Sequence, residues 1–245
     1  MANRLLDRQV SLLEYLTSGA AIFGDKSSAP APRPLRGFDS SLLQMEARFS
    51  YDKRMKKIAG IFPKTFAILG DNRDAVLQAF VETCPPVDIS RIVNGRQFHD
   101  FLVKRWQREP PQPSYLPDVA ACELACGSVR AGLEERQADA SDHEGDAPRG
   151  SFRRHSGLVL LRCAYNVRTI FEDGMDAVPA ERDTPLAVAM PLNAGEPRVF
   201  ELMPVVFDVL VTLDEWTDPA AFGDTAEAKE LIADLIEHRL AEVRV

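Results

Sequence analysis

The sequence lacks the short motifs that mark the commonest enzyme classes. It contains no glycine-rich phosphate loop, no nucleophile elbow and no HExxH zinc motif. Its histidines are scattered without the spacing that metal ligands have on a helix or a hairpin; they are His99, His143, His155 and His238. Composition, spacing and periodicity therefore assign no catalytic residue and no enzyme activity, and a solvated or capping role is favoured for each histidine.

The chain also lacks an apolar run long enough to cross a bilayer, and its charged N-terminus, MANRLLDRQVSLLEYL, is unlike a signal peptide. We therefore expect no membrane association and a cytoplasmic location, in which the four cysteines are thiols. Basic residues are scarce in the second half. Residues 136–245 carry 11 Lys and Arg against 21 Asp and Glu, whereas residues 1–135 carry 18 against 16. This acidic balance argues against binding of the second half to a nucleic-acid backbone.

The most strongly patterned stretch is Phe49–Gly70. One helical face is formed by residues at steps of four, three and four, namely Tyr51, Met55, Ile58 and Phe62. Proline is tolerated at the first turn of a helix, so Phe62-Pro63 predicts a corner between two helices with Phe62 buried in it. Gly70 is predicted to end the second helix in a left-handed conformation.

Residues 1–135 as a whole are predicted to form an all-α domain. A first amphipathic helix is expected over residues 3–18, with an inward face made of Leu6, Val10, Leu13 and Leu16. Asp39 is expected to cap a long helix that leads into the central stretch. The pair Asn94-Gly95 predicts a turn.

Residues 136–156 are charged, small and almost free of aliphatic side chains, which predicts a disordered linker. Residues 157–245 are then predicted to form a small α+β domain. Its three expected strands are Leu158–Tyr165, Leu186–Met190 and Arg198–Met203. One of its two helices is expected to start at Pro204, and the other to be opened by the capping-box pair Asp224 and Glu227. The predicted fold class is thus α+β, with the helical domain first.

Two groups of side chains could carry chemistry. Cys122 and Cys126 share a helical face and could form half of a metal site, but no second pair completes it, so packing as small hydrophobes is favoured. A basic cluster could contact nucleic acid, but it lies on a face expected to be solvated; it consists of Arg48, Lys53, Arg54, Lys56 and Lys57. The sequence therefore predicts no metal or cofactor in this chain.

A series of short motifs, each weak alone, occurs in an order that resembles the HvfC/BufC family. The series is Tyr51…Arg54, Phe62-Pro63, Leu69-Gly70, Pro85-Pro86, Phe98…Phe101-Leu102 and Tyr115-Leu116-Pro117-Asp118-Val119-Ala120…Glu123. The resemblance covers about residues 1–135. It is looser in the second domain, where it consists of the run near Tyr165 and of Phe207…Leu213-Asp214-Glu215-Trp216.

The resemblance implies an accessory subunit that forms a heterodimer with a multinuclear iron enzyme. The enzyme would hold the iron and modify cysteine in a ribosomally made precursor peptide, while the second domain of this chain would hold the leader of that peptide. We expect the leader to add as a strand at an exposed sheet edge. The candidate edge residues are Leu186, Val188, Met190, Val199 and Glu201, and the candidate residues for the partner interface are Arg54, Tyr115 and Asp118.

Two other functions are weighed against this one. A DNA-binding regulator would need a basic recognition helix. The last predicted helix instead carries Glu227, Glu230, Asp234 and Glu237 against Lys229 and Arg239, which disfavours DNA. An enzyme activity of this chain alone has no motif behind it.

Overall fold

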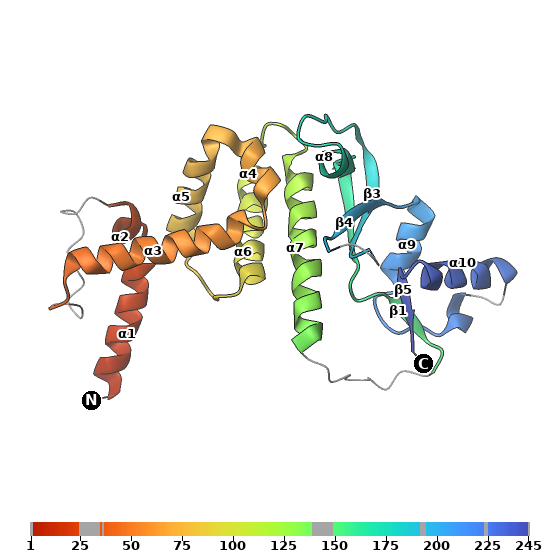
Figure 1. Cartoon of the computed structure of the whole chain (residues 1–245), viewed down its shortest axis with the longest axis horizontal. Helices are drawn as coiled ribbons and strands as arrows, with labels where there is room; N and C mark the ends of the chain where they lie inside the picture. Colours follow the sequence, from red (N-terminus) through yellow and green to blue (C-terminus); the bar gives the residue numbers. More distant parts are fainter. Residues whose placement is uncertain are drawn as a thin grey trace. The chain divides into compact units, whose positions relative to one another are not determined.

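The computed structural model describes residues 2–24, 35, 37–138, 149–191, 195–222 and 225–244. Helices dominate the first half and two small sheets lie in the second, so the predicted α+β class is confirmed (Figure 1). The chain divides into two compact units, Met1–Ala120 and Ala121–Val245. In the described part of the chain, no helix is both long and apolar enough to span a membrane.

The first unit is helical. Its elements are α1 (Ala2–Leu16), α2 (Gly19–Phe23), α3 (Ser40–Ala59), α4 (Pro63–Leu69), the 3-10 turn η2 (Gly70–Asn72), α5 (Arg73–Thr83), α6 (Arg91–Trp106) and the start of α7 (Leu116–Ala138). Asp39 caps α3, because its carboxylate accepts hydrogen bonds from the N–H groups of Ser41 and Leu42. Pro63 opens α4, and Gly70 follows it with a φ of 51°, as the sequence predicted.

Aromatic rings hold this unit together at the predicted corner. Phe62 is fully buried between α3 and α4. Its ring meets that of Phe98 edge-on, with centroids 5.4 Å apart, and Phe98 makes similar contacts with Phe66 at 5.5 Å and Phe80 at 5.1 Å. Edge-to-face pairs add to the stabilisation from area burial, so Phe98 of α6 is the centre to which α4 and α5 attach.

The turn predicted at Asn94-Gly95 is wrong, because both residues lie inside α6 and are buried. A Cβ atom on Gly95 would lie 2.5 Å from Cδ1 of Ile61. A larger residue here would displace the end of the Ile61 side chain, so glycine permits the close approach of α6 to the corner after α3. Asn94 likewise has a tertiary role, since its side chain donates to the carbonyl oxygens of Asp88 and Ser90.

The first helix forms as predicted, but its predicted inward face is wrong. Leu6, Val10 and Leu13 are 59%, 45% and 64% exposed. The periodicity gave the apolar stripe of α1 correctly, but a stripe does not specify which surface covers it.

The second unit contains the rest of α7 and two antiparallel sheets. Its further elements are β1 (Phe152–Arg154), β2 (Val159–Tyr165), α8 (Arg168–Glu172), β3 (Glu181–Ala189), β4 (Arg198–Glu201), α9 (Pro204–Thr212), the 3-10 turn η3 (Pro219–Phe222), α10 (Ala226–Glu237) and β5 (Ala241–Val243). One sheet has the order β2-β3-β4 and the other pairs β1 with β5. Asp224, the predicted cap of the last helix, lies outside the described residues.

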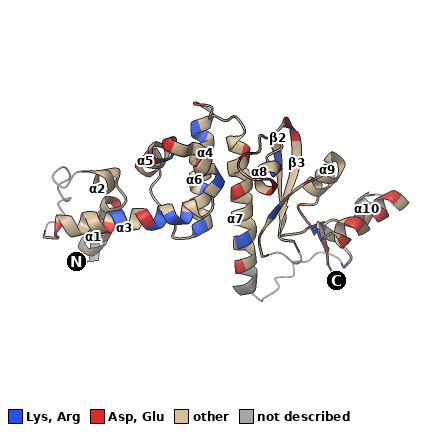
Figure 2. Ribbon diagram, turned by 45° about the horizontal axis from the view of Figure 1, so that its top comes forward, with Lys and Arg blue, Asp and Glu red and all other residues tan. Residues whose placement is uncertain are grey.

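The three-stranded sheet is covered on both faces. Ala187 of β3 belongs to a buried cluster with Leu210 and Leu213 from the end of α9 and Leu235 of α10. α8 packs beside β4, and Arg130 of α7 pairs with Glu196 in the β3–β4 connection. Both ribbon views place α7 and α9 on opposite sides of this sheet (Figures 1 and 2).

The predicted disordered linker, 136–156, needs correction at both ends. Its first three residues complete α7, and Phe152 near its other end is fully buried in the core of the second unit. Residues 139–148 lie outside the described part. The segment was predicted to be disordered because its composition is charged, although Phe152 begins a strand within it. β1 and β5 are too short to show the alternation of apolar and polar residues by which a strand is predicted. The division between the units falls within α7, before the boundary at 135 that the sequence predicted.

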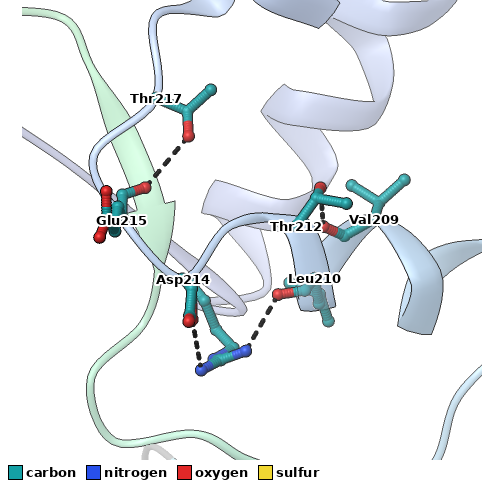
Figure 3. A network of polar contacts seen from close by, with 7 residues as sticks. Val209, Leu210, Thr212, Asp214, Glu215 and Thr217 are labelled. Atoms are coloured by element: carbon teal, nitrogen blue, oxygen red, sulfur yellow. Dashed lines mark hydrogen bonds and ion pairs between the residues drawn. The ribbon is translucent and has the colours of Figure 1, made fainter.

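Arg154 of β1 fixes this strand to the end of α9. Figure 3 labels two of the residues that accept its hydrogen bonds, Leu210 and Asp214. The Arg154 guanidinium donates to the carbonyl oxygen of Leu210 at 3.2 Å and to the carboxylate of Asp214 at 3.2 Å, while the backbone N–H of Arg154 donates to Leu213 O at 2.7 Å. A cation at the C-terminal end of a helix satisfies free carbonyl groups and the helix dipole. Residues 149–156 before β2 are thus part of the second unit.

The aromatic centre of the first unit gives a stability prediction. We expect Phe62→Ala to lower the free energy of unfolding by about 3–5 kcal/mol, because it removes a fully buried ring from the Phe98 cluster. The matched control is Phe49→Ala, at a half-exposed position on α3, with an expected loss of under about 1 kcal/mol. Urea denaturation measures both. Equal midpoints for the two variants would show that the corner is not a core element.

Candidate functional site

The strongest candidate site is the free edge of β4. Five residues were predicted to lie on an exposed edge, but β3 is the central strand, so Leu186 and Val188 are paired on both sides and fully buried. This part of the prediction is wrong because β3 begins five residues earlier than expected and has a partner on each side. Met190 lies just beyond the end of β3. Val199 and Glu201 do lie on an edge strand.

The register shows which backbone groups of β4 face outward. Leu202 donates its N–H to Pro185 O at 2.9 Å, one step beyond the registered pair Leu186 and Glu201. Hydrogen-bonded and non-hydrogen-bonded pairs alternate along an antiparallel ladder. The N–H and C=O groups of Phe200 therefore face β3, whereas those of Val199 and Glu201 point away from the sheet, which is the geometry that a further strand needs.

The edge at β4 carries buried, exposed apolar and charged side chains. Val199 is buried, whereas Phe200, on the other face, is 39% exposed. Glu201 pairs with Arg182 of β3 at 2.7 Å, and the hydrogen bond from Arg182 lowers the pKa of the Glu201 carboxyl below its ordinary value. Met203, the second residue after the strand, is 68% exposed. Exposed apolar side chains thus lie beside unpaired backbone groups.

The opposite edge of the sheet is β2, which has one charged residue, Arg162. By the same alternation, Leu160 and Arg162 point their backbone groups away from β3. The Arg162 guanidinium forms two hydrogen bonds with the Asp183 carboxylate, at 2.6 and 2.9 Å, and lies 3.9 Å from Asp208. Charged side chains on an edge strand disfavour pairing with another chain, but β4 also carries two of them, Arg198 and Glu201, so charge does not separate the two edges. β4 is the more suitable edge because the exposed apolar side chains of Phe200 and Met203 lie along it.

The three residues predicted for a partner interface are not a single exposed patch. Arg54 is 9% exposed, which corrects its assignment to a surface. Tyr115 and Asp118 are half-buried, and each has an interaction partner within the chain. Asp118 lies in the first turn of α7, two residues past its start. Neither of the two is among the contacts of Arg54.

Arg54 instead joins three helices of the first unit. From α3, its guanidinium donates to Asn94 Oδ1 at 2.9 Å, to Cys84 O at 2.8 Å and to Gln97 Oε1 at 2.7 Å. Its Cζ lies 4.4 Å from the centre of the Phe80 ring. Burial lowers the pKa of Arg54 to about 10. The sequence placed this residue in a solvated basic cluster because its helical neighbours are lysines.

The two cysteines considered as metal ligands lie on the α7 segment of the second unit. Cys122 is fully buried and Cys126 partly buried. Burial raises the pKa of the Cys126 thiol to about 11. Within the described ranges, no three His, Cys, Asp or Glu side chains are grouped so that they could hold a metal ion.

Neither the family models nor the curated proteins with which the chain was compared match it. The sites above are accordingly defined by their geometry. Of these sites, only the β4 edge combines unpaired backbone groups with exposed apolar side chains.

The raised pKa of Cys126 gives a pH-dependent prediction. A thiol with a pKa of about 11 is ionised in about one molecule in a thousand at pH 8. We expect alkylation of Cys126 by iodoacetamide to accelerate about tenfold per pH unit up to pH 10 in the folded protein. Peptide mapping by mass spectrometry measures the rate, and the urea-unfolded chain is the control, with an ordinary thiol. A plateau below pH 9 in the folded state would contradict the assignment.

Proposed function

We propose that this chain is a non-catalytic cytoplasmic subunit that binds the leader of a ribosomally made peptide and pairs with a multinuclear iron enzyme that modifies peptide cysteine. The observation that carries the proposal is the open edge of β4, with the backbone groups of Val199 and Glu201 turned outward. The enzyme class and the kind of peptide come from the sequence resemblance to the HvfC/BufC family.

The binding step would be addition of the leader as a strand. An extended peptide beside β4 meets N–H and C=O groups on alternate residues, so its main chain supplies the affinity. Four residues form a short edge, and selectivity then comes from side chains that reach Phe200 and Met203. These contacts favour a leader with apolar residues on one face of the paired segment.

The charge of the second unit favours a basic leader. α10 carries several acidic residues, which are coloured red along its ribbon in Figure 2. Complementary charge speeds the encounter and helps to fix the register of a bound peptide. The same acidic helix is unsuited to the phosphate backbone of DNA, so it supports the peptide proposal over a DNA-binding regulator.

The first unit would contact the iron enzyme in this proposal. Its described helices leave apolar side chains exposed on α1 and α3, among them Leu13 and Phe49. Exposed apolar surface of this kind is typical of an interface. The iron would be held by the enzyme, and this chain would contribute the position of the peptide.

Proline substitution at an outward-facing position tests the docking edge. We expect Glu201→Pro to weaken leader binding at least about tenfold, because the ring replaces an outward N–H and blocks the added strand without removing a bond to β3. Glu201→Gln removes only the charge and should change binding by less than about threefold. Isothermal titration with the synthetic leader encoded beside this gene measures the affinity.

Two further proline variants test whether the loss of leader binding is specific to β4. Arg162→Pro makes the same change on β2 and should leave leader binding unchanged. Val199→Pro also removes an outward N–H but disturbs a buried side chain, so circular dichroism must accompany it. Folded Glu201→Pro and Val199→Pro proteins that bind the leader like the wild type would exclude β4 as the docking edge.

The proposal that the enzyme holds the iron gives a prediction about the metal content of this chain. Because the described residues contain no cluster of metal ligands, we expect the isolated chain to carry no stoichiometric iron or zinc, whereas its complex with the enzyme contains iron. Elemental analysis of both preparations measures this. One tightly bound iron per isolated chain would overturn the accessory role.

A further inference from the structure

Arg54 is a buried cation that no described carboxylate neutralises. Its acceptors are two side-chain amides and one backbone carbonyl, and the Phe80 ring lies beneath it. These bonds use three of the five N–H groups of a guanidinium, so one N–H on each terminal nitrogen is left over within the described part of the chain. A buried charge is costly unless an opposite charge pairs with it.

A cavity of about 230 Å³ lies beside this arginine in the first unit. Two further cations line it, Lys53 and Lys57, against one carboxylate, Asp88. The Asp88 carboxylate accepts a hydrogen bond from the N–H of Ser90 at 2.7 Å and keeps its charge, so three cations stand against one anion in the lining. The cavity is therefore positively charged on the side of α3.

The remaining walls of the cavity are mainly apolar. They come from the end of α1, from α2, from α5 and from the segment between α5 and α6, with Leu16, Ile22, Val81, Pro86 and Ile89 among them. An apolar cavity of about 150 Å³ can hold a benzene molecule. This cavity is larger, so it has room for an apolar body of that size together with a small anionic group.

We propose that the cavity binds a carboxylate attached to a small apolar body, with the carboxylate held at Arg54 and Lys57. The two spare guanidinium N–H groups suit the two oxygens of a carboxylate, because paired charge-assisted hydrogen bonds of this kind are strong and directional. The apolar walls suit a branched or aromatic group and offer little to the remaining oxygens of a phosphate. The site is in the first unit and does not depend on the role proposed for β4.

The ligand could be a free carboxylic acid or the C-terminal residue of a peptide, and the probes separate these sources. 4-Methylpentanoate represents the free acid, and 4-methylpentanamide is its uncharged control. A dipeptide ending in leucine represents the chain terminus, and inorganic phosphate tests for unspecific anion binding. We expect the acid to bind saturably and the amide at least about tenfold more weakly, since it lacks the charge-assisted bonds.

The readouts are isothermal titration and the NMR signal of the Arg54 Nε–H, followed in the full chain. Binding of the acid should shift this signal. A dipeptide that binds more tightly than the acid identifies a chain terminus as the ligand, and the reverse order identifies a free acid. Amide or phosphate binding equal to that of the acid, an unmoved Arg54 signal, or no saturable binding would overturn the proposal.

Variants of the lining cations connect the binding to this cavity. Lys57→Met should weaken binding of the acid at least about threefold, whereas Lys56→Met, at the preceding position of α3 and outside the cavity, should leave it unchanged. Arg54→Lys keeps the charge but loses the paired donors and should weaken binding at least about tenfold. Arg54→Lys could disturb the fold, so the comparison of Lys57→Met with Lys56→Met decides the outcome. Equal affinity of these two variants for the acid would show that the ligand binds outside this cavity.

Discussion

Pairing of β3 on both of its sides is the constraint on which the second unit depends. It buries Leu186 and Val188, and it leaves β4 as an edge whose outward groups belong to alternate residues. A central strand forms hydrogen bonds with a strand on each side, so its register is more strongly fixed than that of either neighbour. The availability of Val199 and Glu201 is thus a consequence of the position of β3.

Local signals in the sequence predicted much of the first unit. The Phe62-Pro63 corner, the Asp39 cap and the left-handed Gly70 were all correct, because each depends on residues close together in the chain. Asn94-Gly95 failed as a turn because both residues lie inside α6, where Gly95 packs closely against Ile61, more than thirty residues away. Periodicity likewise predicted the apolar stripe on α1, but it did not show whether other residues cover that stripe.

The candidate sites were harder to predict than the fold, because they depend on contacts between distant segments. Three strands of the second unit were placed approximately, but their order in the sheet is a tertiary property and decided which residues lie on an edge. Arg54 looked like its lysine neighbours in sequence. Its burial became evident only where α3 meets the end of α5 and the start of α6. The burial of Phe152 was missed in the same way, because the charged residues around it in sequence predicted disorder.

The pairing of β1 with β5 closes the second unit across a long stretch of chain. Arg153 and Glu242, which form an ion pair across these strands, are 89 positions apart. Closing so large a loop costs entropy that only the assembled core can offset. The small sheet should consequently form late in folding, after β2, β3 and β4 have joined through shorter connections. Opening it would release the segment before β2 and the segment after α10 together, so β1 and β5 should separate in one cooperative step.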